Sequence, residues 1–226
     1  MKIGIISDIE GNDRHLSAVL DCLSDCGHIF NLGDSVGDKG DSDRVITMLN
    51  RKRIRSVAGN HDLEVVLSKS VGADRYMAET LQSSSELYHP KVRLNADSMA
   101  FIKALKLTLK ARYKRKLFAF CHSIYGRLAD DLYFEYVNAE NACDLLTSAG
   151  GDMVFVGHSH RPSIVVVKKT GNASIVKLKN RISLSMDDRY KYIVNPGSIG
   201  APRLKGLKYS YATLDLENYT LSVELV

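Results

Sequence analysis

The chain has 226 residues, of which 45% are hydrophobic and 25% charged, and its formal net charge is +5. This size and balance predict a single domain, residues 1–226, that can build an apolar core without disulfides. No apolar run approaches the roughly 20 residues of a membrane-spanning helix, and the polar residues after Ile6 do not fit a signal peptide. We therefore expect a cytoplasmic protein with reduced cysteines and no membrane association.

The first sixty residues alternate between strand and helix patterns. Strands are predicted at 2–7, 28–32 and 54–58, and helices at 14–26 and 41–50. The first helix is indicated by apolar residues at helical spacing, and Gly27 is expected to end it. A β-α-β-α-β order implies parallel strands joined by right-handed crossovers.

The second half of the chain is predicted to be rich in strands. The segment 63–105 is expected to be mainly helical. A hairpin follows, with strands at 107–112 and 116–121 and its turn at 113–115, and then a helix at 138–149. Further strands are predicted at 153–156, 163–168, 173–177, 190–194, 209–215 and 220–226. The fold class expected is α/β, a four-layer α-β-β-α sandwich of two mixed β-sheets flanked by helices.

Five polar clusters each follow an apolar strand pattern directly. They occupy residues 7–12, 33–38, 59–62, 121–123 and 157–160. The carboxyl ends of parallel strands lie along one edge of a sheet, where ligands usually bind. Glycines in these clusters allow sharp turns and a close approach of the backbone to an anion. We therefore expect the polar side chains of the five clusters to converge.

The clusters supply carboxylate, amide and imidazole groups but no cysteine that we assign as a metal ligand. The candidate metal ligands are Asp8, Glu10, Asp34, Asn60, His122, His158 and His160. Such donors suit divalent ions, and we expect two Mn ions, with Fe, Zn, Ni or Mg as alternatives. Two ions about 4 Å apart lower the pKa of a bridging water and hold phosphoryl oxygens for displacement. The pattern predicts hydrolysis of a phosphate ester.

The clusters resemble, in order and spacing, the D-x-H, G-D-x-x, G-N-H-[DE], H and G-H-x-H blocks of the calcineurin-like metallophosphoesterase superfamily. The resemblance runs from Lys2 to about Arg203 and is closest to the small single-domain microbial phosphodiesterases, which segment 195–203 also resembles. It implies that Asp34 bridges two ions through its carboxylate. It also implies that Asp8, residue 10 and His160 complete the coordination of the first ion. Asn60, His122 and His158 would complete that of the second ion.

The resemblance also implies catalytic and substrate-binding roles. His61 would donate a proton to the leaving group, and Asp62 would orient its imidazole. Arg203 would contact a substrate phosphate. Asn12 stands where a helix begins, so it either caps that helix or contacts a phosphate oxygen.

Position 10 departs from the family pattern, since Glu10 stands where the D-x-H block has histidine. A glutamate oxygen reaches nearly as far as an imidazole nitrogen, so Glu10 is predicted to bind the first ion and to favour harder ions. Two alternatives remain open. The first site is weakened, or the chain is a non-catalytic scaffold for protein binding.

Two basic clusters, at 51–55 and 103–116, favour an anionic partner. The expected partner is a small phosphorylated substrate. Nucleic acid is the alternative, although no aromatic residues interleave the basic ones as in RNA-binding motifs. The sequence indicates neither the identity of the substrate nor the oligomeric state.

Overall fold

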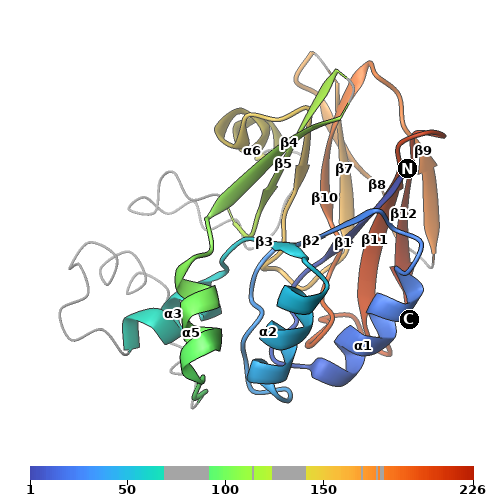
Figure 1. The fold of residues 1–226 in the computed structure, drawn as a ribbon. Coiled ribbons are helices and arrows are strands. Elements are labelled where there is room, and N and C mark those ends of the chain that lie inside the picture. The colour runs from blue at the N-terminus through green and yellow to red at the C-terminus, as the bar shows by residue number, and fades with distance from the viewer. Residues whose placement is uncertain (69–91, 114, 124–140, 169, 177, 179–180) are drawn as a thin grey trace.

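The structure is a computed structural model that describes residues 1–68, 92–113, 115–123, 141–168, 170–176, 178 and 181–226. Within these residues it contains two mixed β-sheets of six strands each and five helices. Helices lie on the outer sides of both sheets (Figure 1). The α/β sandwich expected from the sequence is confirmed.

The first sheet is built around the amino-terminal strands. Its order is β3-β2-β1-β11-β12-β9, with β3 at Arg55–Ser56, β2 at His28–Asn31, β1 at Lys2–Ile6, β11 at Ser210–Asp215, β12 at Thr220–Leu225 and β9 at Ile182–Ser185. Strands β1, β2 and β3 run parallel, as predicted, and the other pairs are antiparallel. The parallel strands therefore end along one edge.

The second sheet has the order β4-β5-β6-β10-β7-β8. Its strands are β4 at Thr108–Tyr113, β5 at Lys116–Cys121, β6 at Met153–Phe155, β10 at Tyr190–Asn195, β7 at Ser163–Lys168 and β8 at Ala173–Val176. Strands β5, β6 and β10 are parallel, whereas β4 and β5 form the predicted hairpin, with Tyr113 opposite Lys116. The parallel strands thus lie within this sheet, whereas in the first sheet they occupy one side, with β3 at the edge.

The main core lies between the two sheets because side chains alternate along each strand. On β5, Phe118 and Phe120 face the first sheet, and the ring of Phe120 stacks on Phe30 of β2 with centroids 3.8 Å apart. The alternate residues Ala119 and Cys121 face outward instead, toward a helix. Each central strand is thus buried on both faces, which explains its nearly continuous apolar sequence.

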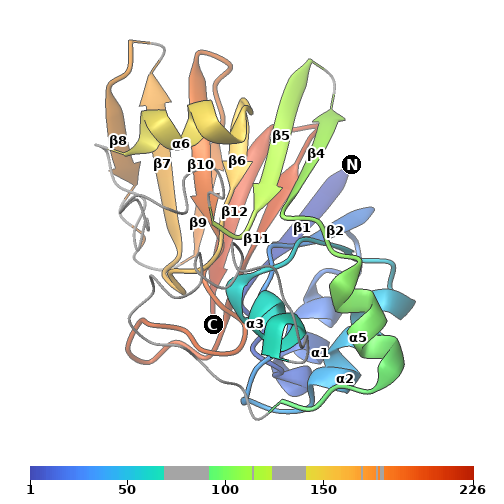
Figure 2. The ribbon, with the colours of Figure 1, turned by 90° about the vertical axis from the view of Figure 1, so that its left-hand side faces the viewer.

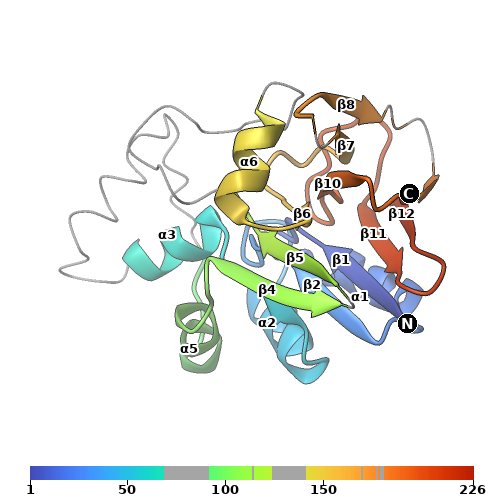
Figure 3. The same ribbon diagram turned by 90° about the horizontal axis from the view of Figure 1, so that it is seen from above.

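Helices complete the outer layers. The first sheet is covered by α1 (Asp13–Cys22) and α2 (Ser42–Arg51), and the second by α6 (Ala142–Ala149), on opposite sides of the sandwich (Figure 3). Helices α3 (Asn60–Ser68) and α5 (Ala96–Lys103) lie together beside α2 (Figure 2). No helix among the described residues combines the length and apolar character needed to cross a bilayer.

Helix α1 ends four residues earlier than predicted, at Cys22. The Leu23 N–H still bonds to the carbonyl of Val19, but the chain then turns, and Cys26 N bonds to Leu23 O. Gly27 therefore does not end the helix; its N–H pairs with Lys2 O and aligns the chain with β1. The helical spacing of apolar residues continues beyond the end of α1 because Leu23, which follows the helix, is also buried in the core.

Other boundaries also differ from the prediction. Strand β3 has two residues instead of five, followed by a single bridge between Val57 and Lys106. Strand β9 was not predicted, because it is a short edge strand whose exposed positions carry little apolar pattern. Within 63–105, the end of α3 and α5 are helical, while residues 69–91 lie outside the described part, as do 138–140 of the predicted helix 138–149.

Candidate metal centre

The five polar clusters meet where the carboxyl ends of parallel strands from both sheets come together. The loops after β1 and β2 carry Asp8 and Asp34, and the loops after β5 and β6 carry His122 and His160. His160 Nε2 lies 3.3 Å from Asp8 Oδ1, and His122 Nε2 lies 3.2 Å from Asp34 Oδ2. These contacts join residues of different sheets, so the centre lies between the two sheets at one end of the sandwich.

Four of these side chains form what we call the first donor group. It consists of Asp8, Glu10, Asp34 and His160, all buried, and their ligand atoms lie within 4.8 Å of one another. His160 Nε2 is 3.4 Å from Glu10 Oε1, close to its distance from Asp8. The first donor group therefore offers three carboxylates and one imidazole to a single point.

The second donor group shares one member with the first. Asp34, His122 and His158 also have ligand atoms within 4.8 Å of one another. Asn60 completes this group, because its Oδ1 lies 3.1 Å from His122 Nε2 and 3.0 Å from His158 Nδ1. Asp34 is common to both groups, which is the position required of a residue that bridges two ions.

The backbone of five of the seven donor residues is strained. Positive φ angles, uncommon for residues with a side chain, occur at Asp8 (52°), Glu10 (55°), Asp34 (51°), His158 (71°) and His160 (56°). Each such conformation costs on the order of 1–3 kcal/mol and persists only where the surrounding structure imposes it. Here the strands fix the start of each loop, and the left-handed turn directs the side chain toward the centre.

A glycine before His158 makes room for the carboxylate of the first loop. A Cβ added at Gly157 would overlap Ser7 Oγ and would also lie 2.9 Å from Asp8 Oδ2 and 3.2 Å from His122 Nδ1. The Gly157 backbone therefore approaches Asp8 more closely than any other residue type permits. The N–H of His158 then donates to Asp8 Oδ1 and Oδ2 at 3.1 and 3.2 Å.

Backbone carbonyls orient two of the imidazoles. His122 Nδ1 lies 2.9 Å from Leu32 O, and His160 Nδ1 lies 2.7 Å from Ala201 O. A carbonyl only accepts, so each Nδ1 carries the proton and each Nε2 faces the carboxylates. Such outer partners fix the ring orientation of histidines that bind metals.

The charges of the centre shift the pKa values of its histidines. Burial alone would lower the pKa of His160, but the negative charges of Asp8 and Glu10 raise it to about 11. Burial likewise opposes the charge of Asp34 at His122, whose pKa rises to about 9. Burial and the charge of His122 together lower the pKa of His158 to about 4. Without a cation, protons on His122 and His160 thus balance the buried carboxylates.

Comparison with known proteins agrees with this geometry. Residues 1–219 match the family described as the calcineurin-like phosphoesterase superfamily domain. The chain belongs to this superfamily. It is 31% identical to an uncharacterized protein of Methanocaldococcus jannaschii over 226 residues, covering 98% of this chain and 85% of the other.

Two solved structures show the same fold. A metallophosphoesterase from Sphaerobacter thermophilus has a TM-score of 0.77 and 24% identity, with 100% of this chain and 88% of that chain covered. A hypothetical protein from Pyrococcus horikoshii has a TM-score of 0.64 and 16% identity, with 100% and 87% covered. The superfamily binds two divalent metals, and the two donor groups have the residue types for them.

Glu10, the departure from the superfamily pattern, lies within the first donor group. Its side chain is buried, and among the described residues Oε1 has no hydrogen-bond partner, its nearest charged neighbour being His160 Nε2 at 3.4 Å. A buried carboxylate oxygen without a donor or cation is unfavourable, and the neighbouring carboxylates of Asp8 and Asp34 make a cation the fitting partner. The donor set therefore fits a metal ion with glutamate in place of histidine.

Asp62 does not orient the imidazole of His61 as predicted. Its Oδ1 accepts the N–H groups of Ser35 and Val36, and its Oδ2 accepts that of Gly59. The carboxylate thus ties together the two loops that carry Asp34 and Asn60. His61 Nδ1 lies instead 3.0 Å from Glu10 Oε2, and the His61 N–H donates to Asp34 Oδ1 at 2.9 Å.

The two predicted substrate contacts have different surroundings. Asn12 caps α1, with its Oδ1 accepting from His15 N at 3.0 Å, which is the structural alternative considered for it. Asp41 caps α2 in the same way, with its Oδ1 accepting from Arg44 N at 3.0 Å. Arg203 is exposed, and its N–H donates to His160 O at 3.3 Å, so it follows directly on the loop that supports the first donor group.

Several supporting groups had not been identified from the sequence. Ser198 Oγ donates to Asp8 O at 2.8 Å, and Gly200 N donates to the same carbonyl at 2.9 Å. Bonds to carbonyls leave no pattern in a sequence, although segment 195–203 had been noted as family-like. Glu64, one helical turn after Asn60 on α3, is also buried, and burial raises its pKa to about 7. Its spacing from Asn60 is the signal that could have revealed it.

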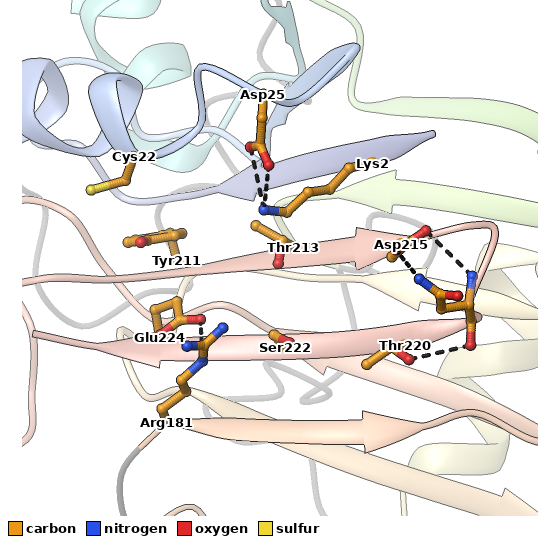
Figure 4. A pocket seen from close by; sticks show the side chains of 11 residues that line it. Lys2, Cys22, Asp25, Arg181, Tyr211, Thr213, Asp215, Thr220, Ser222 and Glu224 are labelled. Atoms are coloured by element: carbon orange, nitrogen blue, oxygen red, sulfur yellow. Dashed lines mark hydrogen bonds and ion pairs between the residues drawn. The ribbon is translucent and has the colours of Figure 1, made fainter.

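A separate hollow of about 560 Å³ lies on the outer face of the first sheet (Figure 4). It is lined by alternate residues of β11 and β12, whose other residues face the core. Four of its five charged side chains form ion pairs, with Lys2 2.9 Å from Asp25 and Arg181 2.8 Å from Glu224, and the fifth, Asp215, accepts hydrogen bonds from Glu217 N and Asn218 Nδ2. None of the residues lining it belongs to either donor group.

Proposed function

We propose that the chain is a metal-dependent phosphoesterase that hydrolyses a phosphomonoester or phosphodiester with two divalent ions, manganese first among them. The observation that supports this best is the sharing of Asp34 by two donor groups. Superfamily membership supports the same reaction class. The proposal includes a single domain, a small phosphorylated substrate, and the cytoplasm, where the four free cysteines would stay reduced.

Bound ions would neutralise charge on the phosphoryl oxygens and make a water more acidic, so that it attacks phosphorus. Asp8, Glu10, Asp34 and His160 would hold one ion, and Asp34, Asn60, His122 and His158 the other. His61 is placed to protonate the leaving group. Its imidazole lies at the rim of the centre, 17% exposed, beside the two carboxylates of Glu10 and Asp34.

A turnover assay tests the proposal. Metal-free protein supplemented with Mn²⁺ should release nitrophenol from bis(p-nitrophenyl) phosphate, and Asn60→Ala should abolish the release. Glu217→Gln is the matched control, because Glu217 is exposed and pairs only with the amino terminus among the described residues. No turnover with Mn²⁺, Fe²⁺, Zn²⁺, Ni²⁺ or Mg²⁺ would contradict the proposal.

The alternative of a non-catalytic scaffold for protein binding depended on Glu10. The position of Glu10 in the first donor group supports the enzyme instead, since the residue is directed at the place where an ion would bind. Elemental analysis separates the two. Fewer than about one ion per chain after supplementation would favour the scaffold.

A nucleic-acid substrate receives less support from the placement of the basic residues. Lys52, Arg53 and Arg55 line a groove with His28, which begins β2. This groove lies at the amino ends of β2 and β3, whereas the donor residues follow their carboxyl ends. A phosphate backbone bound there would not lead into the centre, so a small substrate is favoured.

A further inference from the structure

The two donor groups differ in chemistry, and Glu10 creates much of the difference. The first group contains three carboxylates and one imidazole. The second contains the shared carboxylate of Asp34, the amide oxygen of Asn60 and two imidazoles. A histidine at position 10 would make the two groups similar, whereas Glu10 makes the first group richer in oxygen and in negative charge.

The backbone of Glu10 is held from two sides. Its N–H donates to Asp34 O, and its carbonyl accepts from Lys39 N, both at 2.9 Å. A Cβ added at Gly37 would lie 2.6 Å from Glu10 Cα, and one added at Gly200 would lie 2.7 Å from Glu10 Cβ. The side chain therefore starts from a fixed point, and its reach into the first donor group does not depend on a mobile loop.

The carboxylate of Glu10 has two oxygens in different surroundings. Oε2 lies 3.0 Å from His61 Nδ1, outside the first donor group. Oε1 lies 3.4 Å from His160 Nε2, inside that group, and has no hydrogen-bond partner within the described part of the chain. Only Oε1 is therefore free to bind an ion without breaking the contact with His61.

We propose that Glu10 makes the centre selective, so that the first donor group takes an oxygen-preferring ion and the second a nitrogen-preferring ion. When zinc is limited to one ion per chain and Mn²⁺ is in excess, the second group holds the zinc and the first group holds manganese. Carboxylate oxygens suit Mn²⁺, and imidazole nitrogens suit Zn²⁺. This inference rests on the proposed function, because it requires that two ions bind.

The test locates each ion directly. Metal-free protein is supplied with one equivalent of Zn²⁺ and a large excess of Mn²⁺ and crystallised, and anomalous diffraction at the manganese and zinc edges identifies the ion in each donor group. The wild type should show manganese beside Glu10 and zinc beside His158. Glu10→His, which brings the two groups closer in chemistry, should show zinc divided between both.

A second variant separates charge from geometry. Glu10→Gln keeps an oxygen of the same reach but removes the negative charge. Its affinity for Mn²⁺ in the first group, measured by titration calorimetry and by the electron paramagnetic resonance of free Mn²⁺, should fall at least about tenfold. The exposed variant Glu217→Gln removes one negative charge far from the centre and should leave the affinity unchanged.

The outcomes are distinguishable. The same ion distribution in both groups of the wild type, or an unchanged distribution in Glu10→His, overturns the inference but leaves the proposed function standing if the loaded protein hydrolyses esters. Wild-type protein that binds no ion in either group overturns both. If Glu10→His does not fold, an unchanged Mn²⁺ affinity in Glu10→Gln overturns the inference.

Discussion

Glu10 Oε2 lies 3.0 Å from Nδ1 of His61, although the two residues are 51 positions apart. The contact connects the first donor group to the proposed proton donor through one carboxylate. A carboxylate on Nδ1 holds the imidazole in one orientation and leaves Nε2 as the atom that can protonate a leaving group. Glu10 thus takes the orienting role that had been assigned to Asp62.

The role of His61 predicts a dependence on the leaving group. His61→Ala should lower kcat about 10²- to 10⁴-fold for an alkyl phosphate ester, whose alkoxide must be protonated as it leaves. The loss should be much smaller for nitrophenyl esters, because nitrophenolate departs without a proton. Asn60→Ala is the comparison, since it removes a donor of the second group and should reduce both rates alike. Equal losses in His61→Ala would contradict the assignment.

Binding of metal ions should release protons. In the metal-free protein the pKa of His122 is raised to about 9 and that of His160 to about 11, so both imidazoles are protonated at pH 7. Ion binding needs the free Nε2, so about one proton leaves with each ion, and affinity rises as the pH is raised from 7 toward 9. His158, with its pKa lowered to about 4, is already neutral and releases none.

Calorimetry checks this proton release. Mn²⁺ is titrated at pH 7 in two buffers of different ionisation enthalpy. The difference between the two heats, divided by the difference between the ionisation enthalpies, should correspond to about two protons released per chain. His160→Gln should reduce the difference to about one proton. Heats that do not depend on the buffer would show that the histidines are neutral before the ions bind.

Gly157→Ala should be strongly destabilising. The added Cβ would clash with Ser7 Oγ and would lie 2.9 Å from Asp8 Oδ2, at a buried position. Crowding of this kind costs typically about 1–3 kcal/mol of unfolding free energy. Gly27→Ala is the matched control, because its Cβ would meet nothing nearer than 3.5 Å and its φ is not positive. Chemical denaturation of both variants in metal-free buffer makes the comparison.

Two substitutions of Asn12 distinguish a role in capping α1 from a role in contacting the substrate phosphate. Asn12→Ala removes the cap of α1 and should cost about 1 kcal/mol of stability. Asn12→Asp retains the capping oxygen but replaces the amide with a negative charge, so it should keep the stability and leave KM unchanged if Asn12 only caps the helix. A large rise of KM in Asn12→Asp would instead show that Asn12 lies against the substrate phosphate.

The convergence of the donors was predictable because it follows from topology. Parallel strands end at one edge, so the side chains after β1, β2 and β3 had to meet, and the structure brings Asp8, Asp34 and Asn60 to the same point. The strands were also recognisable, because their buried residues are consecutive apolar ones. The sequence pattern does not indicate which partner each of the two oxygens of a carboxylate contacts.

Features that depend on the backbone were beyond prediction. The orientation of His122 by Leu32 O and of His160 by Ala201 O leaves no trace in residue type. The structure does not support the role predicted for Asp62, because both of its carboxylate oxygens accept backbone N–H groups while His61 Nδ1 lies beside Glu10. Strand β9 was missed because an edge strand pairs on one side only and needs no alternating apolar residues.

The contact of the His158 N–H with the Asp8 carboxylate spans 150 positions of sequence and joins a loop of one sheet to a loop of the other. Ions held by the donors on either side of this contact would act as a cross-link between the halves of the sandwich. Removing them would free that end of the molecule to open, so chelation should speed amide exchange in these loops before it unfolds the strands.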